Sequence, residues 1–374
     1  MNIKQIKNKT EWEKFVLAQL STIFVQSYKY GEFYEKMGES SWIFGIYDDG
    51  KLIGGSLVVS THAKRGDFLY LPYGPLLPEE NREEALQELT NFLKNFAKEN
   101  KYSFIRVSPF IDETDKTKKI FKNAGYKNAP IHVLAETTWL LDIQKSDEEL
   151  LMNMKKNHRN LIRRCERDGV KIEKKSDPKN LVEFNKLHNE TAKRHNFHRF
   201  SDSYVKKEFS VFAPDNEVML FNAYLPSTKK TVTESEKEKS THSKTKNYQS
   251  TSSLVRGLPD GRLDSSSVII FYGNMAAYRH SGSLGLNKKL PTSYLLQWEA
   301  IKEAKKRGIR YYNFWGIAPV NAHKKHPFKG ITHFKKGFNG FQKDLLHCQD
   351  LPVSAKYWVT WVIETIRNFN RGFK

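Results

Sequence analysis

The chain has 374 residues, of which 39% are hydrophobic, and this length favours two packed domains over a single core. Lys and Arg outnumber Asp and Glu by 62 to 42, which gives a formal charge of +20 at pH 7. Such a surplus favours an anionic partner, whether nucleic acid, anionic lipid or a phosphorylated substrate, although a generally lysine-rich proteome would produce it too.

Three absences in the sequence bear on the compartment. No run of about 18 apolar residues is present, so no membrane-spanning helix is expected. The opening residues contain no apolar stretch of signal length. The two cysteines, Cys165 and Cys348, are far apart in sequence and form no metal-type pair, as is typical of a reducing compartment. We therefore expect a cytoplasmic protein without a metal site.

The first part of the chain predicts helices and strands in a clear order. Apolar spacing predicts helices at residues 11–20, 32–37, 81–100 and 115–125. Residues 42–59 predict two strands joined by an Asp-Gly turn, the strongest short signal for a hairpin. Further strands are predicted at residues 68–77, 102–109 and 132–143.

The second part repeats that order. A capping box of Ser146 and Glu149 opens a predicted helix at 146–167. The remaining predicted helices are at 183–194, 203–212 and 291–307, and the predicted strands are at 217–225, 266–281, 309–316 and 341–348. The shared order is that of the GNAT acyltransferase fold. The predicted fold class is α/β (α+β), with two tandem GNAT-like domains at residues 1–142 and 143–344.

Two segments fall outside this plan. Residues 226–266 are rich in Ser, Thr and Lys with few apolar side chains, so we expect a disordered insert in the second hairpin. The tail, residues 357–374, predicts a short basic amphipathic helix. That helix could dock on its own domain or contact a membrane surface, and the sequence leaves both interpretations open.

Residues 291–340 carry the most specific pattern. They read PTSYLLQWEAIKEAKKRGIRYYNFWGIAP and, after a His- and Lys-rich loop, HPFKGITHFKKGFNG. A helix with a Gln-Trp pair leads into an aromatic strand that ends at Trp315-Gly316, and a later turn presents Lys335 and Lys336 between Phe334 and Phe338. This pattern resembles the signature of the FemABX family, the Fem-type aminoacyltransferases that build peptidoglycan cross-bridges.

The resemblance implies an activity and its partners. The enzyme would move Gly, Ala or Ser from aminoacyl-tRNA onto the stem-peptide diamino acid of lipid II or UDP-MurNAc-pentapeptide. Aminoacyl-tRNA would be a co-substrate, and no cofactor is expected. The resemblance also implies that residues 345–374 return to the first domain. We expect a monomer in the cytoplasm, with peripheral contact to the inner membrane face as a further possibility.

Lys335 is the candidate catalytic residue, because in the family the first lysine of this motif lies in the cavity shared by donor and acceptor. Aminolysis of an aminoacyl ester creates a tetrahedral oxyanion and releases a ribose oxygen, and a fixed cation stabilises both charges. The alternative is that Lys335 pairs with a structural carboxylate. Lys336 is expected to be more peripheral.

A basic helix is the candidate for phosphate binding. Lys155, Arg159, Arg163 and Arg167 are spaced four apart and would share one helix face, while Leu151, Met154, Leu161 and Cys165 would line the opposite face. Four like charges in a row favour a bound anion such as the tRNA backbone or a pyrophosphate. A solvated face with acidic neighbours is the alternative. The family has a similar KKN-R pattern at this point.

The resemblance implies further substrate contacts. Tyr278 falls on the family's aromatic position, and a period of two would place His280 on the same face of the strand. Two departures weaken the match: Val107 follows Arg106 where relatives tend to have an acidic residue, and Tyr34 occupies a lysine position, which leaves Lys36 as a candidate for phosphate binding. The full set of substrate-binding candidates is Lys36, Arg106, Tyr278, His280, Asn313, Gly316 and Lys336.

Competing functions have weaker support. His195 and His198 lack further paired ligands for a metal. An acyl-CoA enzyme should show a glycine-rich pyrophosphate loop opening a helix, and the nearest string, RHSGSL, fails at its last position. A GNAT-like N-acyltransferase with a donor other than tRNA, and a non-catalytic RNA- or membrane-binding module, remain the alternatives.

Overall fold

The computed structural model describes residues 1–62, 66–227, 261–322, 326 and 328–371. The predicted disordered insert lies mostly outside these ranges. Its last residues do not, because strand β10 (Arg262–Tyr272) begins within the predicted insert.

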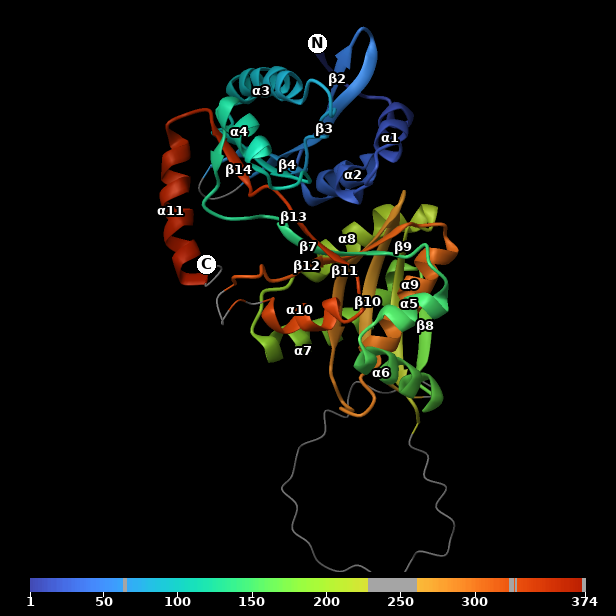
Figure 1. Ribbon diagram of the computed structural model, residues 1–374. Coiled ribbons are helices and arrows are strands. Elements are labelled where there is room, and N and C mark those ends of the chain that lie inside the picture. Colours follow the sequence, from blue (N-terminus) through green and yellow to red (C-terminus); the bar gives the residue numbers. More distant parts are fainter. Residues whose placement is uncertain (63–65, 228–260, 323–325, 327, 372–374) are drawn as a thin grey trace, which may run out of the picture.

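Two seven-stranded sheets form the frame of the described chain, one in each half (Figure 1). The first sheet has the strand order β1 (Asn2–Gln5), β2 (Ser41–Asp48), β3 (Lys51–Thr61), β4 (Phe68–Tyr73), β5 (Phe104–Pro109), β14 (Gln349–Pro352) and β6 (Lys127–Asn128). The second has the order β13 (Phe341–Asp344), β7 (Thr137–Asp142), β12 (Tyr311–Gly316), β11 (Met275–Ser283), β10, β9 (Val218–Leu225) and β8 (Lys171–Lys175).

The helices divide between the two sheets. Around the first lie α1 (Lys9–Leu17), α2 (Tyr28–Met37), α3 (Arg82–Glu99), α4 (Asp115–Asn123) and α11 (Lys356–Arg371). Around the second lie α5 (Asp147–Asn153), α6 (Lys156–Arg167), α7 (Leu181–His195), α8 (Asp202–Phe212), α9 (Thr292–Lys306) and α10 (Lys329–Lys336). Three 3-10 turns complete the described elements: η1 (Phe24–Gln26), η2 (Pro178–Asn180) and η3 (Ala213–Asp215).

The two halves repeat one plan. In each sheet the described strands pair antiparallel except for one parallel pair, β4 with β5 in the first and β11 with β12 in the second. The predicted hairpin at 42–59 is present as β2 and β3, and both residues of its Asp49-Gly50 turn have positive φ, as a two-residue hairpin turn needs. The predicted fold class, two tandem GNAT-like domains, is confirmed.

The strand pairing corrects the predicted domain boundary at residue 142. Strand β7 belongs to the second sheet, where it pairs with β12 and β13. The N-terminal part of the chain that belongs to the first sheet therefore ends before residue 137. The predicted strand at 341–348 is replaced by β13 in the second sheet and β14 in the first. The chain therefore crosses back between residues 344 and 349, and α11 follows beside the first sheet.

The predicted helix at 146–167 is also wrong in one respect, because the structure breaks it at Met154. Met154 is extended (φ −67°, ψ 157°) and its side chain is buried, which ends α5 and starts α6 two residues later. The Lys155 amide donates to the carbonyl of Gly337 at 2.9 Å instead of to its own helix. A contact with a distant segment thus overrides the local helical pattern.

The halves share a core. The largest hydrophobic cluster joins residues of both, and within it Phe24 meets Phe212 at 5.7 Å between ring centroids and Phe33 meets Tyr204 at 4.8 Å. Helices α2 and α8 pack against each other across this junction. No described helix combines the length and apolarity that a bilayer span demands.

Candidate functional site

Lys335 lies in the last turn of α10, in a helix rather than the predicted turn. Its side chain is buried, with 6% of the residue exposed, and its Nζ donates to the carbonyl oxygen of Gly316 at 2.6 Å. Burial lowers the pKa of Lys335 to about 7. No carboxylate of the described residues forms an ion pair with Lys335, so the alternative of a structural salt bridge finds no support there.

The acceptor of that hydrogen bond follows a strained residue. Trp315 has a φ of +65°, a left-handed conformation that a bulky side chain rarely adopts. The Asn313 side-chain oxygen accepts from the Trp315 amide at 2.8 Å, and Asn313 is fully buried. Asn313 therefore holds the turn that directs the Gly316 carbonyl, rather than lying open to a substrate.

Gly316 has a steric reason to be glycine. A Cβ at this position would approach Ala135 Cβ and a ring carbon of Phe328 to 3.1 Å each. Such contacts are tighter than ordinary van der Waals packing, so a side chain here would push on the wall beside Lys335.

Tyr278 lies next to Lys335, but His280 does not share its face. The Lys335 Nζ is 5.8 Å from the centroid of the Tyr278 ring. A β-bulge interrupts the pairing of β10 with β11, so that Val268 pairs with His280 and Ile269 pairs with Tyr278. The extra residue, Arg279, reverses the alternation. The prediction that a period of two places Tyr278 and His280 together is therefore wrong.

The bulge instead brings Arg279 and His280 onto one buried carboxylate. Arg279 and Glu208 form a bidentate ion pair whose shortest distance is 2.9 Å, and His280 Nε2 lies 2.7 Å from the other Glu208 oxygen. The Glu208 side chain is 1% exposed. Burial alone would raise the pKa of Glu208, but Arg279 and His280 together lower it to about 2. Burial lowers the pKa of His280 despite this partner.

Arg279 also joins the buried cluster to the turn beside Lys335. Its guanidinium carbon lies 5.4 Å from the Trp315 ring and 5.8 Å from the ring of Phe24, which belongs to the first half of the chain. Its Nη2 donates to the Tyr204 hydroxyl at 3.1 Å. The charged pair is therefore packed between the halves of the molecule and against the strained residue.

Sequence reasoning missed this cluster, although one signal was present. Val205, Glu208, Phe209 and Phe212 fall at helical spacing and are all buried, so Glu208 occupies a position on the apolar face of α8. A carboxylate at such a position needs a buried partner. The partner itself depends on the bulge, which the sequence pattern does not reveal.

Helix α6 contacts the end of α10, the helix that carries Lys335, through His158. The His158 side chain is buried, and its Nε2 lies 2.9 Å from the carbonyl oxygen of Phe334, one residue before Lys335. Burial lowers the pKa of His158. Together with the bond from the Lys155 amide to Gly337, this fixes the beginning of the basic helix against the end of α10.

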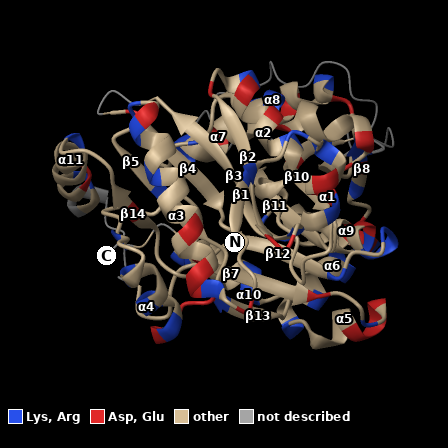
Figure 2. Ribbon diagram, turned by 90° about the horizontal axis from the view of Figure 1, so that it is seen from above, with Lys and Arg blue, Asp and Glu red and all other residues tan. Residues whose placement is uncertain are grey.

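The predicted basic face is only partly free. Lys155, Arg163 and Arg167 are exposed, and Arg167 pairs with the neighbouring Asp168 at 2.7 Å. Arg159 turns back to the carbonyl oxygens of Met152 and Met154, at 2.6 and 3.0 Å, which the break after α5 leaves without helical partners. Figure 2 shows Lys and Arg along the ribbon of α6.

The predicted opposite face of this helix is also changed by the break. Cys165 is buried and Leu161 is partly buried, and His158 and Ile162 complete the inner side of α6. Met154 is buried from its extended position between the helices, while Leu151 belongs to α5.

Arg106 has a structural role that contradicts its prediction as a substrate contact. It is 1% exposed, its Nε and Nη2 donate to Asp350 at 2.7 and 2.8 Å, and its Nη2 also donates to Glu364 at 2.7 Å. These carboxylates come from β14 and α11. The acidic partner that Val107 does not provide is thus supplied by the returning C-terminal segment.

Two predicted lysines lie apart from this arrangement. Lys336 points to the edge of the second sheet, where its Nζ donates to Gln342 at 3.3 Å and lies 5.0 Å from the ring of Trp139. Lys36 is exposed in the last turn of α2, and its role in phosphate binding stays a prediction.

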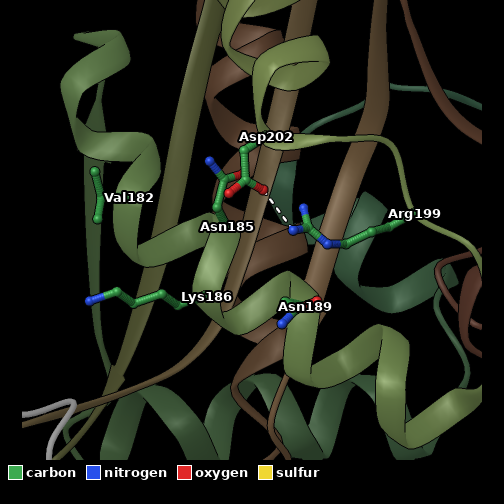
Figure 3. Close-up of a pocket in the computed structure, with 6 residues that line it drawn as sticks. All are labelled: Val182, Asn185, Lys186, Asn189, Arg199 and Asp202. Carbon is green, nitrogen blue, oxygen red and sulfur yellow. Dashed lines mark ion pairs between the residues drawn. The ribbon is translucent and has the colours of Figure 1, made fainter.

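Lys335 lines neither the cavity beside α7 and α8 nor the one beside α4. A cavity of about 250 Å³ opens at α7 and α8, lined by Val182, Asn185, Lys186, Asn189, Arg199 and Asp202 (Figure 3). Arg199 and Asp202 form an ion pair across it at 2.6 Å. In the described residues, no three His, Cys, Asp or Glu side chains gather as a metal site would require, and His195 and His198 are no exception.

Comparison with known proteins identifies the fold and the family. The FemAB family model matches residues 8–256 and 225–365. The lipid II:glycine glycyltransferase of Staphylococcus haemolyticus (strain JCSC1435) is 23% identical over 366 residues, covering 87% of each chain. That of Staphylococcus epidermidis (strain RP62A) is 23% identical over 293 residues, covering 68% of this chain and 70% of its own.

Solved structures agree on the architecture. The crystal structure of FemX superposes with a TM-score of 0.79 at 17% identity, covering 97% of this chain and all of FemX. A tandem GNAT protein from the clavulanic acid biosynthesis pathway has a TM-score of 0.52 at 9% identity, covering 94% of this chain and 98% of its own. With the family model matching most of its length, the chain is a transferase and belongs to the FemAB family.

Proposed function

We propose that this protein transfers an amino acid from aminoacyl-tRNA to the stem-peptide amine of a peptidoglycan precursor, either lipid II or the soluble UDP-linked pentapeptide. The relatives in both staphylococci are named lipid II:glycine glycyltransferases, which supports lipid II as acceptor and glycine, with alanine or serine as the other candidates, as the transferred residue.

The observation that carries the proposal is the environment of Lys335. The buried Lys335 amine donates to one backbone carbonyl and pairs with no carboxylate of the described residues. Burying an amine in this way lowers the free energy of unfolding. Lys335 lies beside Trp315, whose backbone is strained, and two residues before Gly337. The Gly337 carbonyl accepts from the amide of Lys155, the residue before α6. Costly and strained groups gathered in one place are typical of sites that perform chemistry.

The reaction needs little from the protein beyond positioning and charge. The acceptor amine attacks the ester carbonyl carbon, a C–N bond forms, and the carbonyl oxygen becomes an oxyanion. The C–O bond to the tRNA ribose then breaks, and the proton lost by the amine ends on the ribose oxygen. The Lys335 ammonium would stabilise the oxyanion and the leaving oxygen, and no cofactor takes part.

The basic residues at the start of α6 and along it would hold the aminoacyl-tRNA. Lys155, at the N-cap of α6, and Arg163, on α6, are exposed, and His158 of this helix contacts the end of α10. They are therefore placed to contact phosphates of a tRNA whose ester end reaches Lys335. Arg167 would add to this surface by exchanging Asp168 for a phosphate.

An acyl-CoA donor is less favoured. The string RHSGSL, nearest to a pyrophosphate loop, lies largely within β11 and does not open a helix, since α9 begins only at Thr292. The amides that would cradle a pyrophosphate at a helix start are therefore not supplied by this string. We infer a cytoplasmic location, because a nucleotide-linked acceptor and charged tRNA would both be met there, and the monomeric state stays a prediction.

The test is a transfer assay with a charged total-tRNA pool carrying radiolabelled amino acids. Purified protein is incubated with lipid II or the soluble UDP-linked pentapeptide, with and without RNase. Label on either precursor that RNase abolishes would support the proposal and name the amino acid. Folded protein that labels neither acceptor would overturn it, and a panel of acyl-CoA donors would follow.

A further inference from the structure

Helix α11 exposes a row of apolar side chains to solvent. Trp358, Val359, Val362 and Ile366 are 45%, 60%, 49% and 59% exposed, respectively. Their spacing places them along one side of the helix. Exposed apolar residues are common one at a time, but four aligned on one helix form a surface that calls for a partner. We call these four residues the α11 stripe.

The opposite side of α11 is fixed to the first domain, so the stripe has a defined orientation. Tyr357, Thr360 and Glu364 are 0%, 4% and 8% exposed. Glu364 accepts from the buried Arg106, and the Tyr357 hydroxyl donates to Asp350 at 3.3 Å. The helix is therefore not a loose tail whose apolar side could fold back, and Figure 1 shows it at the outer edge of the molecule.

Basic side chains lie beside the stripe. The Nζ of Lys127 lies 4.8 Å from the centroid of the Trp358 ring, and Lys356 and Arg367 are exposed on α11 itself. Lys127 also lines a cavity of about 390 Å³ together with Lys122 of α4, while Lys118, at the same cavity, pairs with Glu113 at 2.8 Å. The described part of α11 contains one acidic residue, Glu364, and Arg106 neutralises it. Figure 2 shows α4 and α11 at the same end of the molecule, each with basic and acidic residues.

We propose that the α11 stripe and its basic rim bind the surface of an anionic lipid bilayer, with α11 lying in the plane of the interface. Aliphatic side chains and a tryptophan enter the boundary between headgroups and acyl chains, while Lys and Arg contact anionic headgroups. The inference rests on the proposed function for its purpose, since a lipid-linked acceptor would be met at such a surface.

The chemistry favours a bilayer over two other occupants. A second copy of this chain would bring the same positive rim and a net charge of +20 to the contact, so the copies would repel each other. RNA would satisfy the lysines, but it offers no apolar phase for two valines and an isoleucine. An anionic bilayer matches both features at once.

Vesicle flotation tests the proposal without any substrate. The full chain is mixed with vesicles of phosphatidylcholine alone or with about one third phosphatidylglycerol, and the bound fraction is measured. Wild-type protein should float with the anionic vesicles, and binding should weaken as salt rises. Val359→Asp should reduce the vesicle partition coefficient about tenfold or more, and Lys127→Gln about fivefold, as expected for one basic residue near the surface.

Val182→Asp is the matched control, because Val182 is 59% exposed on α7 and Val359 is 60% exposed on α11. Val182→Asp should bind vesicles like wild type, and thermal melts should show both variants folded. Three results would overturn the proposal. Wild-type protein could fail to float with anionic vesicles, the two Asp variants could bind equally, or light scattering could show a dimer that Val359→Asp dissociates.

The transfer assay separates this inference from the proposed function. Val359→Asp should keep its activity on the soluble UDP-linked acceptor and lose activity on lipid II embedded in anionic vesicles. If wild-type protein floats with vesicles yet labels neither acceptor, the proposed function is wrong, while the proposed lipid-binding surface is supported. Transfer to lipid II in vesicles that Val359→Asp leaves unchanged would remove the stripe from acceptor access.

Discussion

The imidazole of His158 occupies the space that a side chain at Gly337 would need. A Cβ built on Gly337 would lie 1.9 Å from a ring carbon of His158 and 2.0 Å from its Nε2. Gly337 has a φ of −71°, so its backbone conformation does not require glycine. The requirement is the close approach of α6 to the end of α10, the helix that carries Lys335.

Gly337→Ala should therefore push α6 away from the end of α10, the helix that carries Lys335. We expect a loss of about 1–3 kcal/mol in unfolding free energy from overpacking, together with a fall in transfer activity as Lys335 moves. Gly330→Ala is the control, since Gly330 belongs to the same helix and a Cβ there meets nothing within 4 Å. Urea unfolding and the transfer assay measure both effects. Equal behaviour of the two variants would show that the contact with His158 is not a constraint.

The sequence predicted the parts of the fold that local pattern controls. The Asp49-Gly50 hairpin, the amphipathic α3 and the Gln-Trp helix α9 are all present. Local pattern failed where a distant contact decides the outcome. The Gly337 carbonyl takes the amide of Lys155 and helps to break the predicted helix, and two consecutive short strands enter different sheets.

The candidate site divides along the same line. A local motif marked Lys335 and Tyr278 separately as candidates, and the structure places the Lys335 Nζ 5.8 Å from the Tyr278 ring. The grouping of Arg279 and His280 on Glu208 depends on a bulge in β11, which no alternation of side chains reveals. Arg106 was misassigned because its partners lie more than 240 residues away in the chain.

The pH dependence of transfer should reveal which form of Lys335 acts. Burial lowers the pKa of Lys335 to about 7 in the free protein. If the ammonium stabilises the oxyanion, kcat/KM should have a limb that falls as pH rises through about 7. The residual activity of Lys335→Met, expected to be lower by about 10- to 1000-fold, should lack that limb. A wild-type kcat/KM that only rises across this range would instead indicate that the neutral amine acts as a base.

The same lysine should lower the stability of the folded protein. Because its folded pKa is below the value of 10.5 expected in the unfolded chain, the unfolded chain binds the extra proton between about pH 7 and 10.5. Unfolding free energy should thus rise with pH in that window, by up to about 1.4 kcal/mol per unit from this group.

Lys335→Met should remove that contribution. The variant should gain most relative to wild type near pH 6, where the buried charge is present, and the gain should shrink between pH 7 and 10. Lys336→Met, in the same helical turn but only half-buried, controls for the loss of a lysine. Urea unfolding at several pH values measures the difference, and a gain that stays constant with pH would contradict the buried-charge interpretation.

The two arginines of α6 should differ in their effect on tRNA binding. Arg163 is exposed, whereas Arg159 donates to the carbonyls that end α5. Arg163→Gln should reduce the slope of log affinity against log salt by about 0.7–0.9, as expected when one phosphate contact is lost. Arg159→Gln should leave the slope unchanged and lower thermal stability instead. Filter binding across a salt series distinguishes them, and equal slopes for wild type and Arg163→Gln would remove this face from the proposed tRNA contact.

The buried carboxylate of Glu208 should dominate the stability of the junction between the halves. Glu208→Gln keeps the shape of the side chain but leaves the Arg279 guanidinium, 5% exposed, without its counter-charge. We expect a loss of about 3–5 kcal/mol in unfolding free energy at pH 7. Glu190→Gln, on a side chain that is 50% exposed, should change it by less than about 0.5 kcal/mol.

The loss in unfolding free energy caused by Glu208→Gln should shrink as pH falls. Since the Glu208 pKa is lowered to about 2 in the folded protein from 4.5, its charge stabilises the fold above pH 4.5, and this contribution disappears as pH falls from about 4.5 towards 2. The difference between wild type and Glu208→Gln in urea unfolding should therefore narrow across this range, because a protonated Glu208 resembles glutamine. A difference that keeps its full size down to pH 2.5 would mean that shape or hydrogen bonding, not charge, makes Glu208 necessary.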